Sequence, residues 1–332
     1  MSTLAATHPT LLDLAKRQDP DGKIAAIVEQ LNATNEILDD MVWVEGNLET
    51  GHRTTIRTGI PAPTWRKLYG GVQPTKSTTA QITDSTGMME NYSEVDKALA
   101  ELNGNSTAFR ASEDMAIIEG MSQEMATSLF FANEATKPES FTGLVPRFNS
   151  LSANNAQNII DAGGSGTDNT SIWLVVWGPN SVHGIIPKGS KAGLQHRDLG
   201  EVTLESAPGG GGRMQALRAH YRWDAGISVR DWRYVVRIAN IDKSLLKPDL
   251  TTGANILDLM VQALELVQST SGGRPAFYMS RSIRSMMRRM MIDRVKNSTL
   301  NFEQIAGKAV MTFDGIPIRR VDALAGDEAR VV

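Results

Sequence analysis

The stretch SEDMAIIEGMSQEMATSLFFAN, residues 112–133, carries the clearest periodic pattern in the chain. Ser112 is a residue type that caps helix N-termini, and Glu113 and Asp114 place negative charge in the first turn. The pattern predicts a long helix, which would reach roughly 30 Å, and it is also compatible with a plain core helix. Its apolar face consists of residues at helical spacing, namely Met115, Ile118, Met121, Met125 and Leu129.

The sequence before this helix has a different character. Residues 1–50 are expected to form an arm with a short helix, because apolar residues share one helical face between Ile24 and Leu31. Residues 51–92 mix β-prone residues with Gly and Pro turn formers and contain few large apolar side chains. Since a lone hairpin is marginally stable in water, we expect a two-stranded extension that lies on another surface.

The sequence after the helix predicts strands first, then helices, then strands again. Ile172–Trp177 is a continuous apolar run, as is typical of a buried strand. The clustering of elements favours an α+β fold over a strictly alternating one. Further strands are expected near residues 183–186, 201–204, 215–221, 226–239, 276–279 and 309–324, the last with a turn at Asp314–Gly315, and helices at residues 256–268 and 280–296.

Composition excludes several classes of function. The chain has 332 residues, no cysteine and a formal net charge of -3. Without cysteine there are no disulfides, thiolate metal sites or cysteine nucleophiles, and a nearly neutral chain has no overall field that attracts nucleic acid or an anionic membrane. The longest apolar run, Ile172–Trp177, is too short to cross a bilayer, so we expect no membrane partner.

Residue types that usually carry chemistry form no recognised catalytic pattern. No two histidines have the spacing of a metalloprotease motif, and packed or surface histidines are a simpler interpretation than a pair formed by His183 and His196 across a hairpin. The loop Gly163–Gly166 lacks the lysine of a phosphate-binding loop, so we interpret it as a linker. We therefore expect no enzyme activity and no catalytic, cofactor-binding or metal-binding residues. The five histidines are His8, His52, His183, His196 and His220.

One basic segment leaves alternatives open. Arginines share or flank one face of the helix expected at residues 280–296, and Met286, Met287, Met290 and Met291 lie largely opposite. A basic face can contact phosphates, so a nucleic-acid-binding protein is an alternative function. No aromatic residues interleave for base stacking, and a solvated or ion-paired face is simpler; in an assembly these arginines would pair with acids of a neighbour. The arginines are Arg281, Arg284, Arg288, Arg289 and Arg294.

Taken together, these segments resemble the major capsid proteins of tailed bacteriophages with the Hong Kong 97-like fold, especially those of short-tailed phages. The segment Pro138–Leu144 is similar to the polar segment that follows the family's spine helix, and Phe313–Ile318 is similar to its Gly-x-Pro-Val strand. The segment order is permuted, because the peripheral strands precede the axial helices. The resemblance implies an N-terminal arm at 1–50, an extended loop at 51–92, a peripheral domain at 93–250 with the spine helix at 112–133, and an axial domain at 251–332.

The resemblance also implies a function and partners. The chain would self-assemble into pentamers and hexamers of an icosahedral phage head that encloses double-stranded DNA, contacting the packaged DNA non-specifically. Expected partners are a separate scaffolding protein, a portal and a decoration protein, and the expected location is the virion, with host cytoplasm during assembly. Lys67 and Lys76 lie where the family's type member forms a Lys–Asn cross-link, but no matched asparagine or carboxylate is evident, so no cross-link is assigned.

Overall fold

The structure is a computed structural model of the chain, and it describes residues 9, 35–102, 106–206, 212–246, 253–293, 300–305, 308–325 and 327–332. The chain forms two compact units, each assembled from separate stretches of sequence. The helix expected between Ile24 and Leu31 lies outside the described residues. The first unit comprises Met1–Thr34, Met88–Met125 and Lys191–Asp224, and the second comprises Asn35–Gly87, Ala126–Ser190 and Ala225–Val332.

The first unit combines long strands with most of the longest helix. Strands β4 (Gly87–Asp96) and β8 (Gln195–Ser206) both pair with β9 (Gly212–Val229), and the end of β9 continues into the second unit. The short helix α3 (Lys97–Glu101) is capped by the Asp96 carboxylate, which accepts a hydrogen bond from the Ala98 amide at 2.8 Å. Met121 packs with Ala219 and Tyr221 in one small core cluster of this unit.

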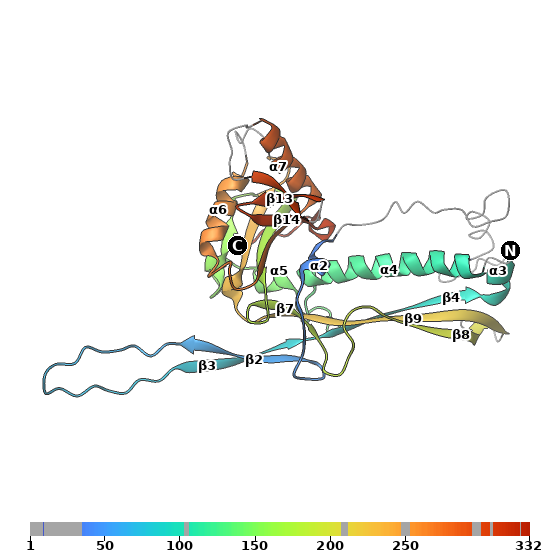
Figure 1. Cartoon of the computed structure of the whole chain (residues 1–332), viewed down its shortest axis with the longest axis horizontal. Helices are drawn as coiled ribbons and strands as arrows, with labels where there is room; N and C mark the ends of the chain where they lie inside the picture. The colour runs from blue at the N-terminus through green and yellow to red at the C-terminus, as the bar shows by residue number, and fades with distance from the viewer. Residues whose placement is uncertain are drawn as a thin grey trace. The chain divides into compact units, whose positions relative to one another are not determined.

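Helix α4 (Ser106–Phe131) is the helix expected at residues 112–133, but it begins earlier (Figure 1). The expectation that Ser112 caps the helix was wrong, because its hydroxyl lies inside the helix and donates to the Phe109 carbonyl at 2.9 Å. The expected apolar face is also only partly buried. Met121, Met125 and Leu129 are buried, whereas Met115 is 60% exposed and Ile118 38%.

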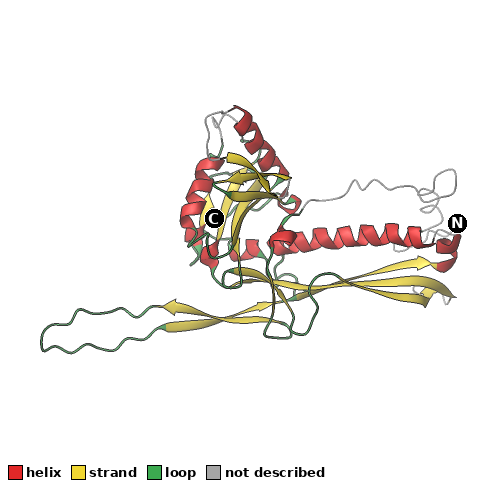
Figure 2. Ribbon diagram, in the orientation of Figure 1, coloured by secondary structure: helices red, strands yellow, loops and turns green. Residues whose placement is uncertain are grey.

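The second unit is built on a sheet whose strands follow the order β12-β13-β14-β11-β6-β7, with β7 pairing to the end of β9. Figure 2 draws the strands in yellow and the helices in red. Every residue of β6 is buried, as expected for the apolar run that it contains. β10 pairs with both β5 and β6, and β1 pairs with β7. The strands are β1 (Trp43–Glu45), β5 (Ile159–Asp161), β6 (Asn169–Trp177), β7 (Val182–Ile186), β10 (Val235–Asp242), β11 (Arg274–Met279), β12 (Leu300–Ile305), β13 (Lys308–Phe313) and β14 (Ile316–Arg320).

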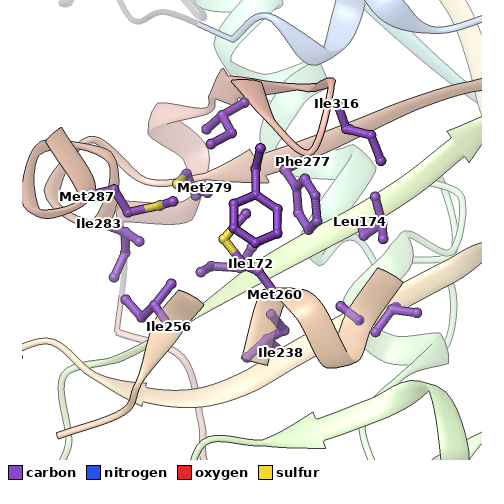
Figure 3. Close-up of a cluster of buried hydrophobic side chains, with 14 of the residues drawn as sticks. Ile172, Leu174, Ile238, Ile256, Met260, Phe277, Met279, Ile283, Met287 and Ile316 are labelled. Atoms are coloured by element: carbon purple, nitrogen blue, oxygen red, sulfur yellow. The ribbon is translucent and has the colours of Figure 1, made fainter. Parts of the chain in front are cut away.

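Helices of the second unit complete its core. Side chains from β6, β10, β11 and β14 point toward those of α6 (Ile256–Leu266) and α7 (Arg281–Asp293), with Ile172, Met260 and Phe277 among them (Figure 3). The shorter helices are α2 (Ile37–Asp40) and α5 (Leu144–Arg147). Because these apolar side chains come from elements far apart in sequence, the core holds the whole unit together.

Most expected segments of the second unit are confirmed, with one correction. α6, β11 and α7 occupy the predicted helix–strand–helix, and the turn between β13 and β14 contains Asp314 and Gly315, both with positive φ. The stretch 226–239 is not one strand. It contains the end of β9, a 3-10 turn at Trp232–Tyr234 and the start of β10, and the Asp231 carboxylate caps that turn by accepting from the Arg233 amide at 3.1 Å.

The second unit also contains the predicted two-stranded extension. β2 (Gly51–Gly59) pairs antiparallel with β3 (Thr78–Ser85), so that Gly51 lies opposite Ser85 and Gly59 opposite Thr78. β2 and β3 form a sheet of their own. The extension ends sooner than residue 92, because the residues from Gly87 onward form β4.

Candidate assembly surface

The tip of the β2–β3 hairpin, defined here as residues 60–77, exposes large apolar side chains. All of its residues except half-buried Gly70 are exposed. Contiguous exposed apolar surface on a folded chain marks an interaction site, since its burial against a partner is favourable. The exposed fractions are 85% for Ile60, 103% for Trp65, 88% for Leu68 and 104% for Tyr69.

The charge of this hairpin has one sign. Between residues 54 and 83 the chain has no acidic residue, whereas Arg57, Arg66, Lys67 and Lys76 are basic. The positive charge disfavours contact between two tips and favours an acidic partner surface. The sequence placed Lys67 and Lys76 in this loop, and the structure places both among the exposed residues.

The root of the hairpin is fixed by a buried carboxylate. Asp84 is 3% exposed, and its two oxygens accept from Arg147 Nη1 and from the Ser228 hydroxyl, each at 2.7 Å. Arg147 also donates to the Thr142 and Ile227 carbonyls. Charge-assisted hydrogen bonds of this kind are strong when buried, so the root forms a rigid base for the tip.

Two glycines allow this root to pack closely. A Cβ at Gly51 would clash with the Asp84 carbonyl, and a Cβ at Gly226 would lie 2.6 Å from the Ser85 carbonyl. The side chain of Ser85 donates to the Glu134 carboxylate at 2.8 Å. Sequence patterns did not identify Asp84, Arg147 and Ser228 as a group, because they belong to segments far apart in the chain.

A buried histidine lies beside the same root. His183 on β7 is 1% exposed, and its ring centroid is 5.6 Å from that of His52. Burial, with a smaller contribution from His52, lowers the pKa of His183 to about 4. His196, which the sequence paired with His183 as a possibility, instead has Tyr221 as its ring neighbour at 4.9 Å.

We predict that the second unit becomes less stable as the pH falls from 6.5 to 4. The ordinary pKa of histidine is 6.5, so the unfolded chain takes up a proton at His183 in this range while the folded chain does not. Stability is therefore fully present above pH 6.5, and the loss is about 3 kcal/mol by pH 4. Denaturant unfolding between pH 4 and pH 7.5 measures it. His183→Leu should flatten this dependence and exposed His196→Gln should not; an unchanged profile in His183→Leu would contradict the assignment.

The basic helix α7 forms ion pairs within its own chain. Arg281 pairs with Asp322 at 3.2 Å and Arg284 with Glu36 at 3.7 Å. Met286, Met287 and Met290 are buried on the opposite side, as the sequence indicated. Arg294 lies outside the described residues. Arg281 and Arg284 therefore each have an acidic partner in their own unit, and the pairing with acids of a neighbouring subunit stays a prediction. Arg288 and Arg289 are exposed.

Within the ranges that the structure describes, no three His, Asp or Glu side chains gather as a metal-binding group. None of the helices in those ranges combines the length and apolar character needed to span a bilayer. The feature that stands out is therefore a surface: an apolar, basic tip on a buried root.

Comparisons with known proteins identify the family to which the chain is similar. The family model described as major capsid protein GP7 matches residues 19–332. A chain in the cryo-EM structure of bacteriophage Epsilon15 is 39% identical, with a TM-score of 0.79, over 100% of this chain and 99% of that chain. A capsid chain of bacteriophage JBD30 is more distant, with 9% identity, 89% and 93% coverage and a TM-score of 0.45. No curated protein sequence matches the chain.

The family match spans nearly the whole chain. The sequence identity to the Epsilon15 chain, 39% over the full length, is high enough for the two chains to share fold and role. Both agree with the α+β fold and with the expectation of a structural subunit. The chain therefore belongs to the major capsid protein GP7 family and is a structural, non-enzymatic subunit of a tailed-phage capsid with the Hong Kong 97-like fold.

Proposed function

We propose that copies of the chain form the pentamers and hexamers of an icosahedral head that encloses double-stranded DNA, and that the hairpin tip of each copy docks on a neighbouring copy. The observation that carries this proposal is the tip itself, in which Trp65, Leu68 and Tyr69 are exposed on a root fixed by Asp84. A surface of this kind is unfavourable in water and becomes favourable when a neighbour covers it. Closed symmetry repeats each contact many times.

The exposed face of α4 has the chemistry that such a tip requires. Met115 and Ile118 are exposed there. Between residues 106 and 125 the helix carries four acids and one base: Glu113, Asp114, Glu119, Glu124 and Arg110. Exposed apolar side chains on a helix segment with a net negative charge complement a tip that is apolar and basic. We therefore infer that α4 of one copy receives the tip of another.

The two units support names for the domains. We infer that the first unit is the peripheral domain, with α4 as its spine helix, and that the part of the second unit around α6 and α7 is the axial domain. The range 93–250, assigned to the peripheral domain from sequence, also contains β6 and β10, which share one core with α6 and α7. Grouping by shared core favours placing these strands with the axial domain.

Other partners are part of the same proposal. A separate scaffolding protein would direct assembly in the host cytoplasm. A portal, packaged DNA held non-specifically and a decoration protein would complete the particle. Uniform shells of correct size from this chain expressed alone would disprove the separate scaffold.

The expected product of assembly is a particle of megadalton size. Sedimentation velocity and negative-stain microscopy of the purified full-length chain, co-expressed with the scaffolding protein of its phage, would detect such shells. A nucleic-acid-binding monomer would instead sediment near the chain mass of 36.1 kDa and bind DNA in a salt-sensitive manner. A chain that stays monomeric under every assembly condition would contradict the proposal.

A further inference from the structure

The glycine-rich loop that joins β5 to β6 covers a pair of carboxylates. Sequence analysis interpreted Gly163–Gly166 as a linker, but Gly164 donates to the Asn240 carbonyl at 2.9 Å, which holds the loop over the end of β10. There the carboxyl groups of Asp168 and Asp242 both lie against Gly166. A Cβ at Gly166 would clash with Asp242 Oδ2 and would lie 3.2 Å from Asp168 Oδ1. A side chain at this position would therefore have to displace the Asp242 carboxylate.

The two carboxylates are differently placed. Asp242 is 7% exposed, and its Oδ1 accepts from the Ser244 hydroxyl at 2.7 Å and from the Ser244 amide at 3.1 Å. Its other oxygen, Oδ2, is the one that faces Gly166 and Asp168. Two carboxylates that lie against the same glycine repel each other unless a proton or a cation lies between them. The neighbouring Lys243 extends to Asp327, 3.1 Å away.

A buried amide side chain lies beside the same glycine loop, with its oxygen next to Gly164 and its nitrogen bonded to Gly166. Asn169 lies directly opposite Asp242 in the β6–β10 register, so both side chains project from the same face of the sheet. Asn169 is 1% exposed, and its amide nitrogen donates to the Gly166 carbonyl at 2.8 Å, which fixes the amide orientation. Its Oδ1 has no hydrogen-bond partner among the described residues. An unsatisfied buried acceptor is costly, so this oxygen needs a hydrogen-bond donor or a cation beside it.

We propose that Asp168, Asp242 Oδ2 and Asn169 Oδ1 bind a divalent cation, calcium, with water completing the coordination. All three donors are hard oxygen ligands, which calcium prefers, and the shared glycine loop gives the flexibility that its larger coordination shell needs. With only two carboxylates, the affinity belongs with the weak sites, for which Kd is on the order of 10⁻⁴–10⁻³ M. The ion would tie the β5–β6 loop to β10 and to the C-terminal segment, because the Glu328 amide donates to the Asn169 carbonyl at 2.9 Å.

Thermal unfolding of the full-length chain tests this site independently of assembly. Calcium chloride at roughly ten times Kd should raise Tm by about 2–4 °C relative to EDTA at matched ionic strength, and the rise should saturate. Asp168→Asn and Asp242→Asn should each abolish the rise. Exposed Glu139→Gln, which removes the same charge elsewhere in the second unit, should retain it.

Calorimetric titration of calcium into the wild-type chain gives a second readout if Asp242→Asn fails to fold. A saturable heat that disappears in half-buried Asp168→Asn supports the site. The proposal is overturned if Asp168→Asn retains the same Tm rise, which would indicate general screening. It is also overturned if calcium has no effect and Asp242→Asn is more stable than wild type, which would indicate a shared proton.

Discussion

Deletion of residues 60–77, with Gly59 joined to Thr78 through two glycines, is expected to leave a folded subunit that builds no stable shell. Gly59 and Thr78 lie opposite each other, so a short turn can close the hairpin. Almost every deleted residue is exposed, so the core loses little, and a shorter loop costs less entropy on closure. The shell loses more, because covering one large apolar side chain contributes about 1.5–3 kcal/mol and the tip carries several on every copy.

Sedimentation velocity and thermal unfolding measure the two halves of this prediction. We expect a Tm close to that of the wild-type chain and a loss of particles of at least tenfold. The variant Trp65→Ser, Leu68→Ser and Tyr69→Ser keeps the hairpin length and should show the same defect, whereas Gln73→Ala should assemble normally. Shells of normal size and yield from the deleted chain would show that the tip is not an assembly surface.

Local patterns predicted those elements whose environment is set by their own residues. The segment of β6 that was predicted is apolar throughout because the strand is buried on both faces. Helix α6 has an apolar stripe because one side of it packs on β10. Both elements could therefore be predicted from sequence. In α4 the same periodicity rule predicted more buried residues than the structure shows. Met115 and Ile118 continue the stripe but remain exposed, because periodicity shows that a face is apolar and not whether the same chain covers it. That excess of apolar surface is what the proposed docking of the tip explains.

The polar groups that hold the root of the hairpin could not be predicted from local sequence patterns. Asp84 meets Arg147 across 63 residues and Ser228 across 144, so no spacing relates them. The extension at 51–85 was predictable because it lacks apolar residues for its own core, but its rigid root was not. The boundaries of the two units were equally hidden, because each unit is assembled from alternating stretches of the chain.

Glu328→Ala is expected to be among the most destabilising single substitutions, although the residue lies near the C-terminus. Glu328 pairs with Arg237 at 2.7 Å, the side chains are 4% and 2% exposed, and the carboxylate also accepts from the Ser171 hydroxyl at 2.8 Å. Burial lowers the pKa of Arg237, and Glu328 opposes that effect. Removing the carboxylate leaves a guanidinium buried above the Trp173 ring without its counter-ion, which costs about 3–5 kcal/mol.

Denaturant unfolding of the second unit gives the measurement, and the adjacent residue provides the matched control. Asp327, whose side chain is 70% exposed, pairs with Lys243 at the surface, so Asp327→Ala should cost less than about 1 kcal/mol. The double variant Arg237→Met, Glu328→Leu should recover much of the loss, since an apolar pair needs no counter-ion. Glu328→Ala and Asp327→Ala are expected to differ because the Glu328 pair is buried and the Asp327 pair is exposed. Equal losses of unfolding free energy in the two variants would therefore mean that the buried pair does not anchor the C-terminal segment.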